Sequence, residues 1–407
     1  MSPEKFRADP SQIAGLGRLI DDLGTDCANI STFVGDNCTP NGDLFTGEII
    51  NDLLAPFNGL AGVFKGRMAD IGTYNKSTAI ELNKAAWMFH DQDMKNYAAL
   101  NAHTSDVASA TPGVYGSDTE RPGQTDAYGA VTAYPKPESI NLNVPTVNQE
   151  DLAGLIGEVA PWLRDVNESI KSVTRMAQKE VDPLVLVLKP IEGNWNEVRR
   201  IGESYKVAGN AMEATGKNLE NGVKLVGPHW DGKAAISFEE NWARRQIAAM
   251  KWEGPVGRVL ADIAGKLADE IRAGIKTALL KLKDMLEDYI EVKSVKGIFK
   301  QVMKRVPGLG VIVEVLDLGQ KIYTIVSTVK DIVDKIEETK NRLKEFLSFL
   351  SGPTRVVAEK LEEKVQPALR TAAVANDLKE IAKVGSTLER PRESYETGTG
   401  RQPWEDG

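Results

Sequence analysis

The sequence has few of the side chains that most metal and enzyme sites use. Among 407 residues there are two cysteines and three histidines, so the usual ligands of a structural zinc site are scarce. We find no Gly-rich phosphate loop, no nucleophile elbow and no HExxH pattern. Catalysis would have to depend on carboxylates, and pairs such as Glu239 and Glu240 are typical of solvated helix faces. We therefore predict a protein that is not an enzyme and holds no metal ion and no cofactor.

The sequence also lacks long apolar runs and an excess of positive charge. No uninterrupted apolar run approaches ~20 residues, so we expect no transmembrane helix. The polar start, MSPEKFRADP, is not followed by the apolar segment of a secretory signal peptide. The formal net charge of -8 disfavours a nucleic-acid backbone as the main partner.

Helical periodicity, by contrast, runs through most of the chain. Apolar residues from Ile13 to Val34 recur at alternating spacings of three and four, which predicts one continuous amphipathic helix. Asp9 is its candidate N-cap and Pro10 its first residue. A second helix is predicted over about 60–100, and two helices joined by a loop can bury their apolar faces against each other. No segment has convincing strand periodicity, so the predicted fold class is all-α.

Changes in periodicity and composition divide the chain into five regions. From the N-terminus these are a helical hairpin, a flexible Pro- and Gly-rich linker, a second hairpin, a region of long amphipathic helices and a disordered tail, over residues 1–103, 104–150, 151–295, 296–388 and 389–407. The last helix is expected from Pro353 to about Leu388. We expect the two hairpins to pack together as an intramolecular, four-helix-bundle-like lobe.

The sharpest local feature is Trp230-Asp231-Gly232, which lies between two predicted helices. Gly227 and Pro228 are typical of a helix end, and a new helical pattern begins after the motif. An antiparallel turn needs a residue that tolerates unusual backbone angles, which Gly supplies, and a Trp ring can cover the open end of a bundle. The alternative is a chance Trp-x-Gly in a chain with seven Trp and 36 Gly.

Residues 194–295, with this turn between two helices, resemble the WXG family of helical-hairpin substrates of type VII (ESX) secretion. The first hairpin resembles the ESX secretion-associated proteins, in which an Ala-rich helix finishes in Tyr-x-x-x-Asp. Here Phe89 stands at the position of the Tyr and Asp93 follows four residues later, so the ring and the carboxylate share one helix face. The alternative is an ordinary amphipathic helix with a core ring and a solvated acid. The resemblance implies four export-recognition residues: Trp230, Gly232, Phe89 and Asp93.

The resemblance also implies a function. We expect a secreted or cell-surface, non-enzymatic effector, carrier or adaptor of an actinobacterium-like cell. Its partners would be the type VII machinery with its FtsK-like ATPase, and a helical partner protein or a separately encoded toxin. Two alternatives remain open. One is a membrane-active, pore-forming toxin, because an apolar, Gly-rich corner at 306–313 separates two long amphipathic helices. The other is a cytoplasmic coiled-coil structural protein.

The two cysteines, Cys27 and Cys38, lie on either side of the expected end of the first helix. Since the resemblance places the chain outside the cytoplasm, a disulfide between them is allowed, and it would pin the helix end to the following loop. The alternative is that Cys27, which belongs to the apolar face, is a small core residue.

Overall fold

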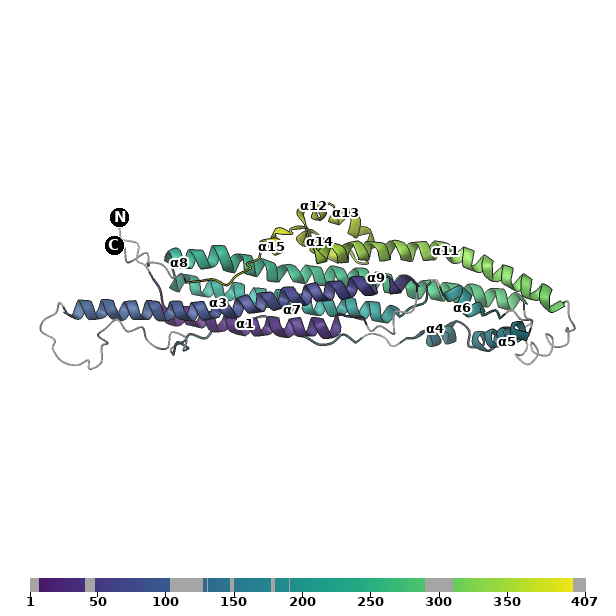
Figure 1. The fold of residues 1–407 in the computed structure, drawn as a ribbon, viewed down its shortest axis with the longest axis horizontal. Coiled ribbons are helices and arrows are strands. Elements are labelled where there is room, and N and C mark those ends of the chain that lie inside the picture. The colour runs from purple at the N-terminus through teal and green to yellow at the C-terminus, as the bar shows by residue number, and fades with distance from the viewer. Residues whose placement is uncertain are drawn as a thin grey trace.

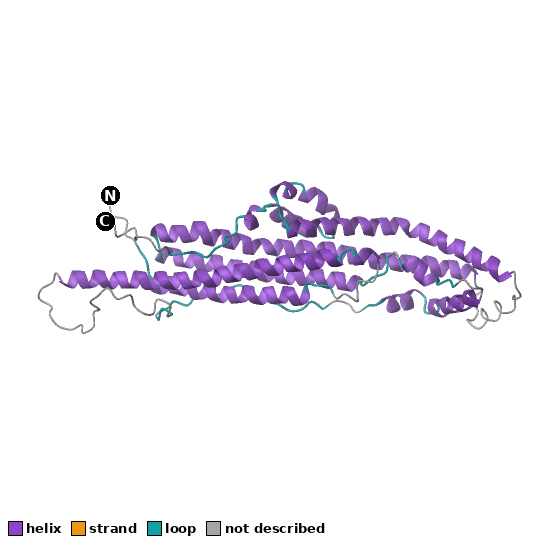
Figure 2. Cartoon of the chain, in the orientation of Figure 1, coloured by secondary structure: helices purple, strands orange, loops and turns teal. Residues whose placement is uncertain are grey.

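The computed structural model contains helices and extended connections and, over the residues it describes, no strand. The predicted all-α fold class is therefore confirmed. The long helices lie side by side along one axis, which makes the molecule elongated (Figure 1; Figure 2). The description covers residues 7–40, 48–102, 127–129, 131–146, 150–176, 180–189, 191–289 and 310–397.

The first hairpin consists of α1 (Pro10–Asn37) and the longer α3 (Leu54–Ala102), with the short α2 (Glu48–Asn51) preceding α3. Asp9 caps α1 as predicted, because its carboxylate accepts a hydrogen bond from the Ser11 amide at 3.0 Å. The apolar face of α1 is buried against α3. At its C-terminal end, α3 extends beyond α1 (Figure 1).

The second hairpin pairs α7 (Trp195–Val226) with the antiparallel α9 (Arg244–Tyr289). The connection between them comprises η2 (Gly227–His229), α8 (Gly232–Ile236) and a π-helical turn, η3 (Ser237–Ala243). With 46 residues, α9 extends for about 69 Å at 1.5 Å per residue. It is long enough to contact α7, the helices that precede α7 and the helices at the C-terminus.

Glycines let α7 and α9 approach until their backbones touch. On α7, Gly202, Gly209 and Gly216 recur every seven residues and so lie on one face. A Cβ at Gly209 would clash with the carbonyl oxygen of Glu253 on α9, and a Cβ at Gly257 would clash with the backbone of α7. This close approach fixes the register of the two helices, because a shift by one residue would place a side chain against backbone.

The two hairpins pack on each other, with α1 against α7. The Arg67 guanidinium on α3 binds both carboxylate oxygens of Glu253 on α9, at 2.9 and 3.0 Å. Arg200 on α7 donates to the carbonyl oxygen of Asn37 at the end of α1, at 2.7 Å. Polar contacts as well as apolar faces therefore join the first hairpin to the second.

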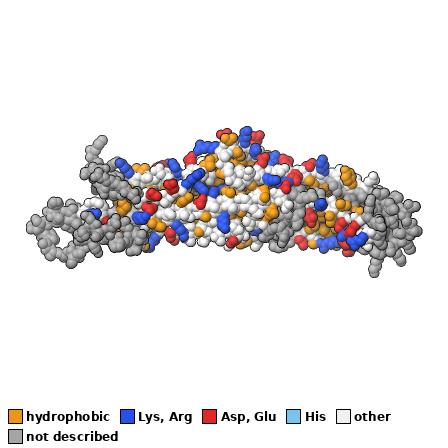
Figure 3. All heavy atoms as spheres, in the orientation of Figure 1, with side chains coloured by type: hydrophobic (Ala, Val, Ile, Leu, Met, Phe, Trp, Pro, Cys, Tyr) orange, Lys and Arg blue, Asp and Glu red, His pale blue; other side chains and the backbone are white. Residues whose placement is uncertain are grey.

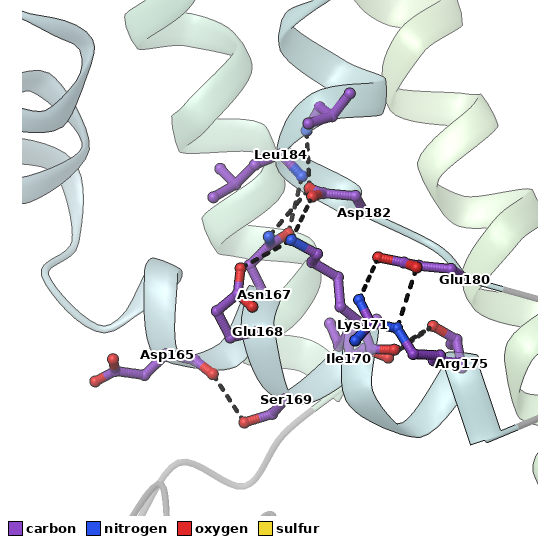
Figure 4. Close-up of polar contacts among 12 residues, drawn as sticks. Asp165, Asn167, Glu168, Ser169, Ile170, Lys171, Arg175, Glu180, Asp182 and Leu184 are labelled. Carbon is purple, nitrogen blue, oxygen red and sulfur yellow. Dashed lines mark hydrogen bonds and ion pairs between the residues drawn. The ribbon is translucent and has the colours of Figure 1, made fainter.

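A group of short helices lies beside the far part of α9, namely α4 (Leu152–Val159), α5 (Leu163–Met176) and α6 (Pro183–Leu188). Figure 4 shows the polar contacts that hold the α5–α6 corner, where Asn167 Nδ2 donates to Asp182 Oδ1 at 3.0 Å. Burial alone would raise the pKa of Asp182, but hydrogen bonds from its neighbours hold that pKa below its usual value. The carboxylate therefore stays charged and serves to close the corner.

The C-terminal region begins with a long helix, α11 (Gly310–Ser351), which is followed by several short helices. A single helix over 353–388 was predicted from the sequence, and this prediction is wrong. Pro367 has no amide hydrogen to donate, and Asp262 on α9 accepts a hydrogen bond from the Thr371 amide at 3.0 Å, which holds the chain in an extended link. The resulting short helices are α12 (Arg355–Ala358), α13 (Leu361–Val365), η4 (Gln366–Ala368), η5 (Ala372–Val374), α14 (Ala375–Ala382) and α15 (Gly385–Leu388).

Part of the expected flexible linker, residues 104–150, is bound to the helices. Over residues 131–146 the chain has neither helix nor strand, and the Thr132 amide donates to a carbonyl oxygen of α1 at 3.1 Å. Glu138 and Asn218 of α7 exchange two hydrogen bonds, each 2.9 Å long. Much of the rest of the linker lies outside the described residues. The apolar side chains that hold the bound part against the core are Val131, Tyr134, Ile140 and Leu142.

The glycine contact between α7 and α9 makes a direct prediction. Replacing Gly209→Ala should lower the free energy of unfolding by about 1–3 kcal/mol, because the new methyl group must push the two backbones apart. The control is Gly66→Ala on α3, where an added Cβ meets nothing within 4 Å, so that variant should be unchanged or more stable by about 0.5–1 kcal/mol. Urea unfolding followed by circular dichroism measures both. Equal stabilities for the two variants would contradict the close packing.

Candidate functional site

Trp230-Asp231-Gly232 forms the turn at the end of the α7–α9 hairpin: it follows η2, and its Gly232 is the first residue of α8. Trp230 and Asp231 have extended backbones, with φ of -144° and -129°. Gly232 has a φ of 87°, in the left-handed region that only glycine adopts readily. The backbone of the turn therefore explains why a glycine stands at this position.

The N-terminal residues pair with this turn as a short piece of antiparallel backbone. The Asp231 amide donates to the Arg7 carbonyl oxygen, and the Asp9 amide donates to the His229 carbonyl oxygen, each at 2.9 Å. The Asp231 side chain accepts from the Arg7 amide at 2.7 Å. The residue that caps α1 is thereby fixed to the turn of the other hairpin, and one side of the turn is covered.

An aromatic cluster fills the space behind the turn. Trp230 is only 3% exposed, and its ring centroid lies 5.4 Å from that of Phe238. Phe238 stacks on Trp242 at 5.6 Å. The indole N–H groups of both tryptophans are buried and have no hydrogen-bond partner in the described structure. The predicted role of Trp230, covering the end of the hairpin, agrees with its burial here.

The first part of the predicted disordered tail, residues 389–407, is placed against this cluster. Tyr395 is 8% exposed, and its ring lies edge-on to Phe238 at 5.4 Å and to Trp230 at 6.5 Å. Burial, reinforced by the nearby carboxylate of Glu81, raises the pKa of Tyr395 to about 12. The prediction of disorder is wrong for 389–397, because the buried ring of Tyr395 holds this segment in place. No sequence pattern indicates this, since a single buried ring has no periodicity. Residues 398–407 lie outside the description.

The second predicted pair, Phe89 and Asp93, lies one turn apart near the C-terminal end of α3. Phe89 is buried, with 8% of its surface exposed, whereas Asp93 is exposed. A binding partner can therefore reach the carboxylate but not the ring. The expectation that both would be read from one accessible helix face is wrong for Phe89, which fills the apolar face of α3 instead.

The disulfide allowed for Cys27 and Cys38 is not formed, and both are free, buried thiols. The reason is the length of α1, which continues to Asn37 and makes Cys38 its C-cap. Eleven residues of helix separate the two by roughly 16 Å, far beyond the reach of a disulfide. Cys27 is a core residue, with its sulfur 3.8 Å from that of Met212 on α7. Burial raises the pKa of both thiols.

Two hollows on the surface are lined largely by charged side chains. The larger, of about 730 Å³, lies between α9 and the short C-terminal helices, where Arg355 pairs with Glu389 at 2.7 Å. The smaller, of about 270 Å³, lies beside the ion pair of Arg272 and Glu150. On the face of the molecule drawn in Figure 3, side chains of both charge signs are interspersed. Neither lining includes a histidine or a cysteine.

No group of three metal-ligating side chains comes together within the described part of the chain. None of the described helices is both long enough and apolar enough to cross a membrane. The apolar corner at 306–313, on which the membrane-active alternative depends, lies partly outside the described residues, and the side chains of its remaining residues are not described.

Comparison with known protein families, curated proteins and solved structures finds no match to this chain. The turn at Trp230, with the chain segments that cover it, is therefore the candidate site on its geometry alone.

The backbone of the turn can be tested with two glycine variants. Gly232→Ala should lower the free energy of unfolding by about 1–2 kcal/mol, because it forces a side chain into the left-handed region. The matched control is Gly227→Ala, three residues before Trp230, where φ is -48° and an added Cβ meets nothing within 4 Å. Chemical denaturation of both variants checks this. A Gly232→Ala variant as stable as Gly227→Ala would show that the turn has a different backbone.

Proposed function

We propose that the chain is a substrate of type VII (ESX) secretion and acts outside the cell as a non-enzymatic effector, carrier or adaptor. The observation that carries the proposal is the Trp-x-Gly turn. Trp230 closes the end of an antiparallel hairpin and Gly232 has the left-handed backbone that the turn needs. This is the arrangement that the resemblance to WXG-type hairpins leads one to expect.

The contact between the two hairpins gives further support. In the secretion family that the chain resembles, export determinants are often divided between two hairpin proteins that associate. Here α1 of the first hairpin packs on α7 of the second within one chain, and Arg7 and Asp9 bind the Trp230 turn directly. The first hairpin would thus serve as the built-in partner of the second.

We further propose a division of roles between the two residues on α3. Asp93 is exposed and would contact the secretion machinery, including its FtsK-like ATPase. Phe89 is buried and would hold the end of α3 in place without being contacted. Trp230 is likewise buried, so recognition would depend on the backbone and polar groups of the turn and not on the indole ring itself.

Export can be measured with a charge variant that leaves the fold intact. Asp93→Asn should lower the ratio of protein in the culture filtrate to protein in the cells at least ten-fold in an actinobacterial host with type VII machinery. Asp22→Asn is the matched control, because Asp22 is also an exposed acid, on α1, and its export should equal that of the wild type. Quantitative blots of the two fractions give the ratio.

A host strain without the ATPase tests type VII export independently of the role of Asp93. The wild-type chain should be absent from the filtrate of that strain. If it appears there in normal amounts, the proposal of type VII export is wrong. If export needs the ATPase but Asp93→Asn is exported like Asp22→Asn, the function stands and the role of Asp93 is wrong.

A further inference from the structure

The C-terminal segment, residues 389–397, lies between α3 and the turn region of the second hairpin, with hydrogen bonds to both. The strip of surface that the segment covers is called the groove below. Later residues of the segment contact later residues of α3, so the segment is parallel to the helix. The Tyr395 amide donates to Thr78 Oγ1 at 3.0 Å, and the Thr397 hydroxyl donates to Glu81 Oε2 at 2.9 Å. The segment is therefore an extended peptide bound alongside a helix.

One side chain anchors this segment. Between residues 391 and 397, Tyr395 alone is buried, and its ring lies against Phe238 and Trp230. Its hydroxyl donates to the Ala234 carbonyl oxygen at 3.4 Å. An aromatic ring seated in a pocket, with hydrogen bonds along the flanking backbone, is how extended peptides are commonly recognised by proteins.

Among the described residues, the segment leaves a buried hydrogen-bond donor of the groove without an acceptor. The indole N–H of Trp230, whose ring lies beside that of Tyr395, is buried without an acceptor in the described structure. A buried donor without an acceptor costs stability. A different peptide with the same ring and an acceptor within reach of this N–H group would therefore bind the groove more favourably than the segment does.

We propose that this groove is a docking site for an extended peptide that carries an aromatic ring, and that residues 389–397 occupy it as an internal ligand. A partner's segment of the same chemistry displaces them. Because the segment is tethered, it competes at a high effective concentration, so the site opens only to a partner that binds well or is abundant. The inference concerns the same turn as the proposed function but does not depend on export.

The test uses the full-length chain with the internal ligand disabled. A fluorescein-labelled peptide of residues 389–397, ERPRESYET, is titrated with the Tyr395→Ala variant and with the wild type, and binding is followed by fluorescence anisotropy. The peptide should bind Tyr395→Ala at least ten-fold more tightly than the wild type, because the groove of the wild type is occupied. The same peptide carrying Tyr395→Ala should bind neither protein.

The control protein is Tyr323→Ala, in which a tyrosine that is 75% exposed on α11 is removed. It should bind the peptide as weakly as the wild type does. Equal binding to the wild type and to Tyr395→Ala would overturn the proposal, as would no binding to a Tyr395→Ala variant whose circular dichroism is that of the folded protein.

A second measurement on the wild type does not depend on any variant folding. Excess unlabelled peptide should speed hydrogen exchange at the Tyr395 amide, because displacement breaks its hydrogen bond to Thr78. Exchange in the buried part of α7 should not change. If the peptide leaves the protection of the Tyr395 amide unaltered at saturating concentration, the segment is a fixed part of the fold and the proposal is wrong.

Discussion

The buried ion pair of Arg67 and Glu253 is the interaction on which the arrangement of the helices depends. Arg67 comes from the first hairpin and Glu253 from the second, and a third donor of the guanidinium reaches the Leu350 carbonyl oxygen of α11 at 3.0 Å. The guanidinium also lies over the rings of Phe64 and Trp252, at 4.5 and 5.5 Å. Separating any one of these three helices would leave a charge or a carbonyl group buried without a partner. Three parts of the chain that are far apart in sequence are thereby held in one position.

With the hairpins fixed in this way, the turn at Trp230 becomes a composite of distant segments. The N-terminal residue Arg7 pairs with its backbone on one side, and Tyr395 covers its aromatic cluster on the other. A hairpin that was free to move would bring neither segment to the turn. The candidate site therefore belongs to the assembled molecule, and the proposals of export and of peptide docking both start from that assembly.

The features that could be predicted from the sequence are those that neighbouring residues determine, such as helix caps and turns. Asp9 was recognisable as a helix cap and Trp230 as part of a turn, because capping residues, Gly and Pro act on their immediate neighbours. The binding of residues 131–146 and of Tyr395 could not be predicted, since a non-helical segment that packs through a few separate apolar side chains has no period. The helix expected over 353–388 failed for a related reason: Asp262, about a hundred residues earlier, takes the amide hydrogen bonds of the chain there.

A double-mutant cycle on the ion pair tests most directly whether the two hairpins form one body. Arg67→Met and Glu253→Leu should each lower the free energy of unfolding by about 3–5 kcal/mol, because each leaves one charge buried and unpaired. The double variant removes both charges, and it should be more stable than either single variant. Losses that simply add in the double variant would show that the two side chains do not meet, and would contradict the packing of the two hairpins described above.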